Sequence, residues 1–568
     1  MRLINTATRA LEEFIGQNIP PYAILSHTWE DGEVSFKEYT EGSHLAKKGY
    51  RKIDMTCKLA ALENIEYAWI DTCCIDKSSS AELSESINSM YRWYFRSKIC
   101  YVYFSDLKTT DDLGPGLPSC RWFSRGWTLQ ELIAPANIHF YDQDWLYRGD
   151  KNSLLPHLLD ITRISREVLR HETPLSSIPV ARRMSWAAYR QTTRLEDVAY
   201  CLLGIFDVNM PLLYGEEEKA FRRLQEEILK STPDLSILGW KLPRKQAALT
   251  DSQGRSFSGV LAPSPDVFLH ADRAGAWTRN DLYLTEFFTS SQGLQIRSRL
   301  FLEPVTAGQG YRSILPVYID EGGRRPTFMY IRLRKLGLGS FVREDPYTIV
   351  RNSVAASSHD APRTRRLVTV GDAGGLLPLS RRPSVLQLHT PPELDIMDVW
   401  PWARWDDEGQ VFFSVEEGDE GSTGVARIRG RLVLDNPTVE VHVDCVIYCL
   451  GWGAVARPHF TILNLRDHAT AINELNTRIA EYDLDFRGVM DSIVRYNLPE
   501  SHSVVLDVRA PGKKVVVSVS ADQDSDVQVH DRPFWRVKVK LRVCAANDAP
   551  RPHDAGWSDL EYLFQFPS

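Results

Sequence analysis

The pattern of apolar and polar positions changes twice along the chain and so predicts three regions. In the first, short apolar runs at residues 22–26, 67–71, 99–104 and 138–141 predict strands. Between them lie stretches with apolar residues at helical spacing, at 45–63 and after Ser79, which opens a Ser-x-x-Glu capping box with Glu82. Strands separated by helices pair in parallel, so we expect an α/β domain over residues 1–150, with a TIR-like or flavodoxin-like sheet.

The second region, residues 151–240, has a helical pattern and is expected to pack on the first as a helical extension. A helix is predicted over about 216–230, where apolar residues recur on one side. Thr193 and Glu196 have the spacing of another capping box, and Gly204 has the character of a helix stop. We interpret these residues as packing and capping elements without chemistry.

From about residue 240 onward, alternating and β-branched runs replace the helical pattern. Examples are residues 294–298, 314–319, 439–443 and 515–519, and turn-forming residues separate them. This pattern predicts a β-rich, sandwich-like region over residues 241–568 with a regulatory or recognition role. Residues 355–392 mix Ser, Arg, Pro and Gly without periodicity, which predicts a long loop.

Composition narrows the class of protein. A chain of 568 residues exceeds a single core, and its 43% hydrophobic and 25% charged residues are ordinary for a soluble protein. A net charge of -7 argues against nucleic-acid binding, and no apolar run has the length of a membrane span. The nine cysteines lack metal-site or disulfide-framework spacing. We therefore expect a cytoplasmic protein with reduced thiols and no metal site.

The segment 120–135 carries the strongest candidate for chemistry. It places the carboxylate of Glu131 one helical turn after Trp127, in a short helix that Pro135 ends. Leu129, Leu132 and Ile133 fall on the other side and can anchor the helix. An indole beside a carboxylate offers a stacking surface and partial desolvation, which raises the pKa of the acid. The alternative is a structural glutamate that pairs with Arg121 or Arg125 or favours the helix dipole.

Polar side chains follow the predicted strands at the edge of the sheet where ligands bind. The first strand ends in Ser26 and His27, with Trp29 shortly after, and the second ends in Asp71. Hydroxyl, imidazole, carboxylate and indole groups together suit a ribose-containing ligand with an aromatic base. Each group also has a structural alternative, since serines cap helices, an aspartate can brace a loop, and histidines are often satisfied within the fold.

Several long motifs resemble the fungal heterokaryon incompatibility (HET) domain. They are Tyr-Ala-Ile-Leu-Ser-His-Thr-Trp at 22–29, Tyr-Ala-Trp-Ile-Asp-Thr-Cys-Cys-Ile-Asp-Lys at 67–77, and Arg-Gly-Trp-Thr-Leu-Gln-Glu-Leu-Ile-Ala-Pro at 125–135. Segments 183–186, 192–200 and 210–215 resemble the helical part that follows this domain in many members. The chain has Glu217 where the family usually has Gly, and Lys77 where Gln is frequent. We expect these two departures to affect loop geometry.

The resemblance implies a cell-death effector of non-self recognition, akin to fungal innate immunity. The HET domain is in turn similar to TIR domains, some of which cleave NAD, and the segment from Ser124 to Glu131 is similar to the TIR segment that carries a catalytic glutamate. By this likeness Glu131 is catalytic, and Ser26, His27, Trp29, Asp71 and Trp127 bind NAD as substrate, with no separate cofactor. The expected activity is an NAD glycohydrolase that cleaves the nicotinamide–ribose bond.

The second hypothesis is that the protein is not an enzyme. In it the α/β domain is a signalling adaptor that associates with itself or with another incompatibility protein, and Glu131 lies in an interface. A pocket deep enough for a nucleotide at the strand ends favours the enzyme, and a flat surface favours the adaptor. The two hypotheses are compatible if assembly completes the site.

Overall fold

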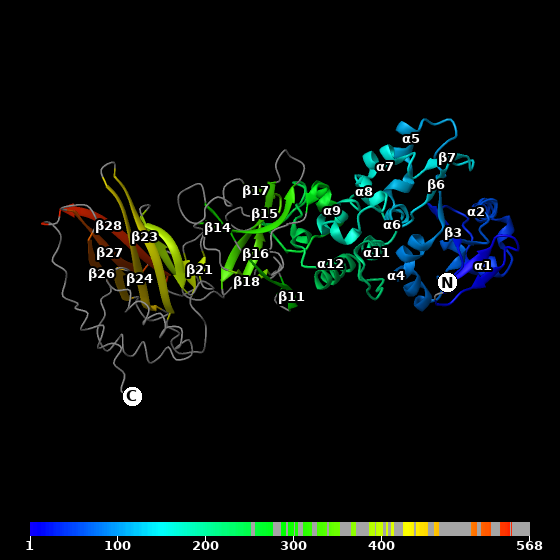
Figure 1. Ribbon diagram of the computed structural model, residues 1–568. Coiled ribbons are helices and arrows are strands. Elements are labelled where there is room, and N and C mark those ends of the chain that lie inside the picture. Colours follow the sequence, from blue (N-terminus) through cyan, green and yellow to red (C-terminus); the bar gives the residue numbers. More distant parts are fainter. Residues whose placement is uncertain are drawn as a thin grey trace.

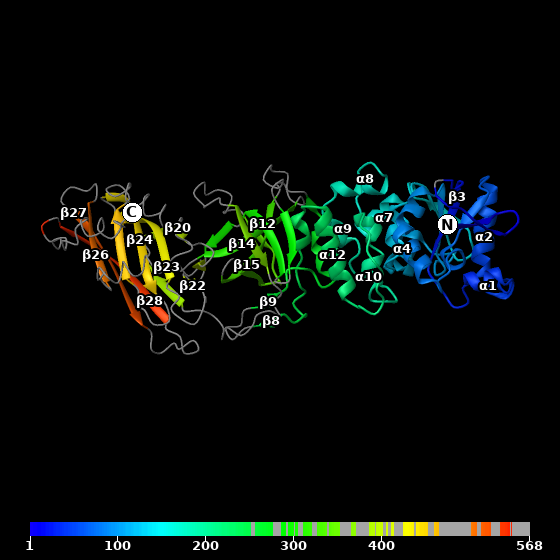
Figure 2. The ribbon, with the colours of Figure 1, turned by 90° about the horizontal axis from the view of Figure 1, so that it is seen from below.

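The computed structural model describes nearly all of the N-terminal half of the chain and mainly strands thereafter. The described residues are 1–16, 18–250, 256–275, 286–290, 293–299, 301–304, 311–320, 327–337, 340–352, 365–370, 385–391, 394–400, 405–406, 411–413, 424–436, 439–452, 459–464, 501–507, 513–523, 534–545 and 547. The molecule is elongated, with the α/β domain at one end, then a helical part, and two β-rich parts at the other end (Figures 1 and 2).

A seven-stranded sheet forms the centre of the N-terminal domain, in the order β2-β1-β4-β3-β5-β6-β7. The four central strands pair in parallel, and β1, β2 and β7 are antiparallel additions at the edges. Counted alone, the parallel strands have the order 2-1-3-4, as in flavodoxin-like sheets. The strands are β1 (Arg2–Asn5), β2 (Leu11–Glu13), β3 (Tyr22–His27), β4 (Tyr67–Trp69), β5 (Ile99–Tyr103), β6 (Ile138–Tyr141) and β7 (Tyr147–Asp150).

The helices between these strands cover the sheet because their apolar sides join its core. The strand β3 is buried along its whole length, as expected for a central parallel strand. The predicted helix at 45–63 is shorter, beginning at Tyr50. The helices are α1 (Phe36–Thr40), α2 (Tyr50–Leu62), α3 (Asp71–Cys74), α4 (Ser80–Arg96), α5 (Leu113–Ser119) and α6 (Thr128–Ile133), with the 3-10 turns η1 (His44–Ala46) and η2 (Arg121–Ser124).

A block of short helices follows and packs against α4 and α6, as Figure 1 shows. Its longest member, α12, buries one side through Phe221, Leu224 and Ile228. The elements are α7 (Leu155–Thr162), α8 (Arg166–Leu169), η3 (Leu175–Ser177), α9 (Val180–Ser185), α10 (Asp197–Tyr200), α11 (Leu203–Phe206), α12 (Lys219–Ser231) and η4 (Leu235–Leu238).

The first β-rich part is a mainly antiparallel sheet that shares its hydrophobic core with the helical block and the N-terminal domain. The buried Arg343 of β16 ties it to η4 by donating to the carbonyl of Leu238 at 3.1 Å. Its elements are β8 (Leu249–Thr250), β9 (Ser256–Ser258), η5 (Pro265–Ala271), β10 (Ala274–Gly275), β11 (Glu286–Ser290), β12 (Gly293–Arg299), β13 (Phe301–Pro304), β14 (Tyr311–Asp320), β15 (Thr327–Gly337), β16 (Ser340–Glu344), β17 (Val350–Asn352) and β18 (Arg365–Val370).

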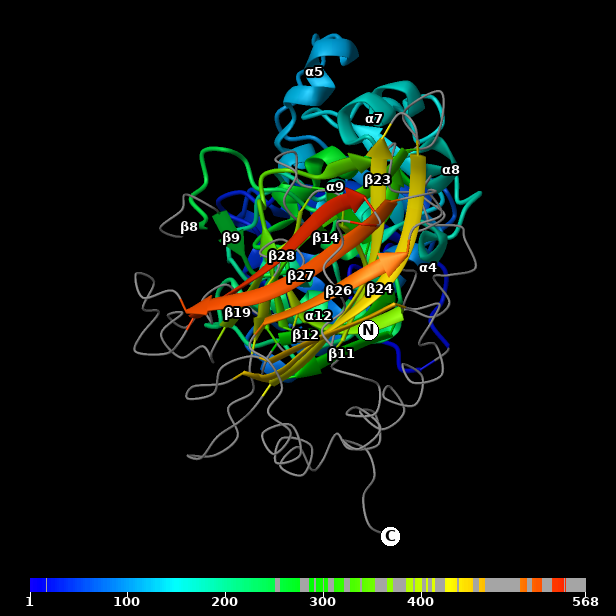
Figure 3. The same ribbon diagram turned by 90° about the vertical axis from the view of Figure 1, so that its left-hand side faces the viewer.

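The second β-rich part is a sandwich with a core of its own. Figure 3 looks along the molecule from this end and shows β27 and β28 crossing over β23 and β24. One sheet has the order β21-β22-β19-β28-β27-β26 and the other β20-β23-β24-β25. The strands are β19 (Val385–His389), β20 (Leu394–Trp400), β21 (Trp405–Asp406), β22 (Val411–Phe413), β23 (Gly424–Asn436), β24 (Val439–Trp452), β25 (His459–Asn464), β26 (Ser501–Asp507), β27 (Lys513–Gln523) and β28 (Phe534–Ala545).

The predicted fold class, an α/β domain with helices followed by a β-rich region, is therefore confirmed. The loop predicted at 355–392 is wrong where β18 and β19 form, and most of that interval lies outside the described residues. In the described part of the chain, every helix is too short or too polar to traverse a lipid bilayer.

Three local predictions about helix ends need correction or qualification. Ser79 caps α4, but the side chain of Glu82 reaches Arg2 and the amide of Asp76, so only half of the capping box forms. Thr193 does not cap a helix, because α10 begins at Asp197 and Glu196 accepts from the amide of Gly215 at 2.6 Å. Gly204 lies inside α11 and does not end a helix.

Candidate functional site

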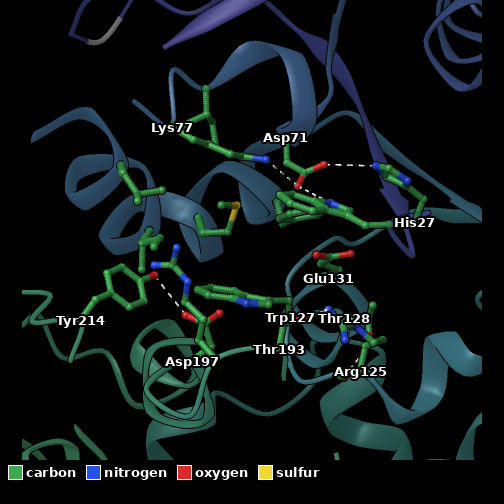
Figure 4. A pocket seen from close by; sticks show the side chains of 17 residues that line it. His27, Asp71, Lys77, Arg125, Trp127, Thr128, Glu131, Thr193, Asp197 and Tyr214 are labelled. Carbon is green, nitrogen blue, oxygen red and sulfur yellow. Dashed lines mark hydrogen bonds and ion pairs between the residues drawn. The ribbon is translucent and has the colours of Figure 1, made fainter. Parts of the chain in front are cut away.

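A cavity of about 320 Å³ opens at the carboxyl ends of β3 and β4, between the α/β domain and the helical block. Figure 4 shows side chains from both parts pointing into it. Its floor is apolar and comes largely from α4, and its polar groups come from the strand ends, α6 and the helical block. The lining residues are His27, Trp29, Asp71, Ile75, Lys77, Leu83, Ile87, Met90, Tyr94, Arg125, Trp127, Thr128, Glu131, Thr193, Arg194, Asp197 and Tyr214.

Glu131 reaches the cavity because α6 is anchored by its opposite side. Leu129 and Leu132 are fully buried in the core, whereas Glu131 is partly exposed. The hydroxyl of Ser26 at the end of β3 donates to Oε2 of Glu131 and accepts from Nε1 of Trp122 at 2.8 Å. The carboxyl group is therefore held from behind by a fixed hydroxyl, and its remaining surface faces the cavity.

The surroundings of Glu131 favour its neutral form. Burial raises the pKa of this carboxyl group to about 8, and the negative charge of Asp71 adds to the effect, while the bond from Ser26 and the charge of Arg125 oppose it. Among the described residues, no cation lies within ion-pair distance of Glu131. A cationic ligand in the cavity would supply the missing charge and favour the carboxylate.

The surroundings of Asp71, in contrast, favour its charged form. Asp71 also forms hydrogen bonds with two other residues of the same cavity wall. It accepts from Nε1 of Trp29 at 2.8 Å and from Nε2 of His27 at 3.2 Å. Burial opposes ionisation here, but the charge of Lys77 and these hydrogen bonds hold the pKa of Asp71 at about 2. Two carboxyl groups of one cavity thus differ in protonation at neutral pH, a pattern that marks acid–base assignments in enzyme sites.

The hydrogen bonds of His27 define its tautomer. Nδ1 lies 3.2 Å from the ammonium group of Lys52, which can only donate, and Nε2 faces the acceptor Asp71. Nδ1 is therefore the acceptor and Nε2 the donor in these two contacts. The pairing makes His27 a support for Asp71, with Lys52 behind it contacting Glu33 and the carbonyl of Thr28.

The two indoles of the cavity are not equivalent. The ammonium group of Lys77 lies over the ring of Trp29, 3.5 Å from its centroid, and 3.9 Å from Asp71. Burial lowers the pKa of Lys77, although Asp71 opposes the shift. One face of Trp29 is therefore covered. Lys77, which we expected to affect loop geometry, instead forms part of the cavity wall, and Trp127 lies in the cavity between Glu131 and Asp197 (Figure 4).

The helical block holds the segment that carries Trp127 and Glu131. Arg190 donates to the carbonyl of Arg125 at 2.9 Å and to the hydroxyl of Thr128 at 3.1 Å. The amide of Gly126 donates to the carbonyl of Gln191 at 2.9 Å. A Cβ atom on Gly126 would come within 2.6 Å of Thr192, so only glycine permits this close approach.

The structure brings together most of the residues predicted from the sequence. His27, Trp29, Asp71, Trp127 and Glu131 line the cavity, and the fully buried Ser26 lies behind Glu131. The second wall was missed: Thr193, Arg194, Asp197 and Tyr214 come from segments that were interpreted as packing. The resemblance could have pointed to these residues, because segments 192–200 and 210–215, which resemble the helical part of HET proteins, contain them. Within the described chain, no group of three or more His, Cys, Asp or Glu side chains could hold a metal ion.

Parts of the chain match two family models and a known incompatibility protein. Residues 22–119 match the family model described as heterokaryon incompatibility protein (HET), and residues 219–295 match a domain of unknown function (DUF8212). Vegetative incompatibility protein HET-E-1 of Podospora anserina is 47% identical over 246 residues, which are 42% of this chain and 18% of that protein. The chain thus spans less than a fifth of the length of this relative. No solved structure matches the chain. Trp127 and Glu131 lie beyond the segment that the HET model matches.

Proposed function

Since the N-terminal part of the chain is a HET domain, we propose that the protein is a heterokaryon-incompatibility effector that cleaves NAD at the nicotinamide–ribose bond. The observation that supports this proposal is the position of Glu131 in a cavity between an indole and polar groups whose chemistry suits a ribose. A volume of about 320 Å³ suits the nicotinamide riboside half of the dinucleotide.

Nicotinamide bound to ribose is a cationic leaving group, so its departure needs no strong general acid. The glycosidic C–N bond breaks, its electron pair stays on the pyridine nitrogen, and positive charge develops on the ribose. The carboxylate of Glu131 stabilises this oxocarbenium-like state. Water then adds to the anomeric carbon, releasing ADP-ribose and a proton. One carboxylate thus suffices where ordinary glycosidases use two.

The raised pKa of Glu131 fits this chemistry because the substrate itself carries the needed charge. With a pKa of about 8, the group is largely neutral at pH 7. The pyridinium of a bound substrate lowers the pKa of a nearby carboxyl group and so favours the reactive carboxylate. Trp127 supplies the aromatic surface against which the cationic ring can stack. Asp71, fixed by His27 and Trp29, is placed to accept a ribose hydroxyl.

The test is NAD consumption by the purified chain over a range of protein concentrations, comparing the wild type with Glu131→Gln. We expect the substitution to lower nicotinamide release by about 100-fold or more, the effect of removing one charge-stabilising group. Glu41→Gln, on an exposed glutamate of the same domain, is the matched control and should leave the rate unchanged. Full activity in Glu131→Gln, or no turnover at any concentration, contradicts the proposal. Cell death without NAD loss would favour the adaptor.

A further inference from the structure

Two arginines at the rim of the cavity have guanidinium groups without a carboxylate partner. Neither Arg125 nor Arg194 forms an ion pair with any described residue. By contrast, Lys77 on the opposite wall lies 3.9 Å from Asp71, so its charge is compensated. Within the described chain, the guanidinium groups at the cavity that lie outside ion-pair distance of a carboxylate are therefore on the side formed by α6 and the helical block.

The two arginines belong to one cluster of hydrogen-bond donors. Nη2 of Arg125 donates to the hydroxyl of Thr193 at 3.4 Å, and Arg194 is the next residue along the chain. With its oxygen accepting from Arg125, Thr193 has its own proton free to donate. Two guanidinium groups and a hydroxyl on one rim are the donor set that proteins use for phosphate oxygens.

Neighbouring contacts fix both arginines without an ion pair inside the described chain. The backbone carbonyl of Arg125 accepts from Arg190, which holds the chain at that point. The guanidinium of Arg194 lies over the ring of Tyr214, 4.2 Å from its centroid, and Tyr214 is in turn held by a 3.1 Å bond to Asp197. Burial raises the pKa of Asp197 and the positive charge of Arg194 opposes this rise, but the two groups lie beyond ion-pair distance. Such preorganisation lowers the entropy cost of binding an anion.

The size of the cavity indicates where a phosphate would lie. The enclosed space takes a base and a sugar, and a strongly hydrated phosphate is easier to hold at a rim open to water. Arg194 is exposed and Arg125 is partly exposed, as such a position requires. We infer that Arg125, Thr193 and Arg194 form a phosphate subsite that selects 5′-phosphorylated nucleosides over free nucleosides. The inference rests on the proposed function for the identity of the base and sugar.

The test compares nicotinamide mononucleotide with nicotinamide riboside, which differ only in the phosphate. Binding is measured by calorimetry on the full chain with Glu131→Gln, so that neither ligand is consumed. We expect the mononucleotide to bind at least about tenfold more tightly, since charge-assisted hydrogen bonds discriminate by this order. Arg125→Gln and Arg194→Gln should each reduce the preference while leaving the affinity for the riboside unchanged. Arg170→Gln, on the exposed arginine that directly follows α8, is the control.

The outcomes separate this inference from the proposed activity. Equal affinity for the two ligands, no binding of either, or a preference that survives in the double arginine variant overturns the phosphate subsite. Glu131-dependent cleavage of NAD together with equal affinities would leave the activity standing without the subsite. An arginine-dependent preference in a protein that does not cleave NAD would leave the subsite standing without the activity.

Discussion

At the scale of single residues, Glu217 adopts a backbone conformation that favours glycine. Its φ is +53°, in the left-handed region, and its amide donates to Glu196 at 3.2 Å. This conformation accounts for the Gly that is usual at this position in the family that the sequence resembles. The loop of Glu217 also carries Tyr214 into the cavity, so the strain lies close to the candidate site.

Replacing this residue tests the cost of the strained backbone. We expect Glu217→Gly to raise the free energy of unfolding by roughly 1 kcal/mol, because a residue with a Cβ atom pays about that much in the left-handed region. Chemical denaturation measures the change. Glu218→Gly is the control, since Glu218 has a right-handed helical φ of -63° and gains nothing from glycine. Equal effects at the two positions would contradict this explanation.

The protonation of Glu131 has a measurable consequence for stability. A carboxyl group whose pKa is raised to about 8 stabilises the fold fully below its unfolded pKa, and this contribution is lost as the pH rises to 8. The wild type should therefore lose stability relative to Glu131→Gln between about pH 5 and pH 8, by a few kcal/mol at most. Denaturation of both proteins at pH 5, 6.5 and 8 gives the difference. A constant difference would place the pKa of Glu131 near its ordinary value.

Sequence reasoning reached the residues that follow strands but not those of the second wall. Trp29, Asp71 and Glu131 could be predicted because parallel strand ends meet at one edge of a sheet. Arg194 and Tyr214 lie in loops and Asp197 begins α10, all in a different part of the chain, and the order of residues does not specify which of these side chains will face the cavity. The stacking of Lys77 on Trp29 likewise depends on side-chain conformation, which the order of residues does not specify.

At the scale of elements, α6 is held at both ends. Arg190 binds its N-terminal side, while His171 and the buried Lys151 donate to the carbonyls of Ile133 and Pro135 at 2.8 and 2.7 Å. Hydrogen-bond donors near the C-terminal carbonyls of a helix satisfy groups that have no partner within the helix. Burial lowers the pKa of Lys151 to about 7, so this end of α6 has a group that titrates near neutrality.

The contact between α4 and α11 depends on a glycine. A Cβ atom on Gly204 would lie 2.0 Å from Cβ of Tyr91, an atom with little freedom to move. We expect Gly204→Ala to lower the free energy of unfolding by about 1 to 3 kcal/mol or more through overpacking. Thermal denaturation provides the measurement. Gly114→Ala in α5, where a Cβ meets only one atom at 3.9 Å, should be neutral or slightly stabilising. Similar losses at the two glycines would show that contact with Tyr91 is not the cause.

The existence and order of the main N-terminal elements followed from apolar periodicity, but their ends did not. Gly204 looked like a stop signal, although it serves close packing inside α11. Glu196 had capping-box spacing, yet its carboxylate binds the amides of Gly215 and Glu217. In both cases a contact with a residue distant in the sequence, and not the local sequence pattern, determines what the residue does.

At the scale of the whole molecule, the buried hydrophobic side chains of the described residues form two separate cores. One runs from the N-terminal sheet through the helical block into the first β-rich part, and the other lies inside the sandwich. We expect two unfolding transitions in calorimetry. Ile24→Ala should lower one and Val517→Ala the other, each by removing a fully buried side chain. A single transition that both substitutions lower would contradict independent cores.

The position of the cavity between two parts of the chain limits how the protein can be divided. A fragment that stops after β7, at residue 150, keeps Glu131 and Asp71 but loses Thr193, Arg194, Asp197 and Tyr214. It also loses Arg190, the brace of α6. Such a fragment would leave the cavity without its second wall. Inactivity of so short a piece would therefore say nothing against the chemistry of the intact chain.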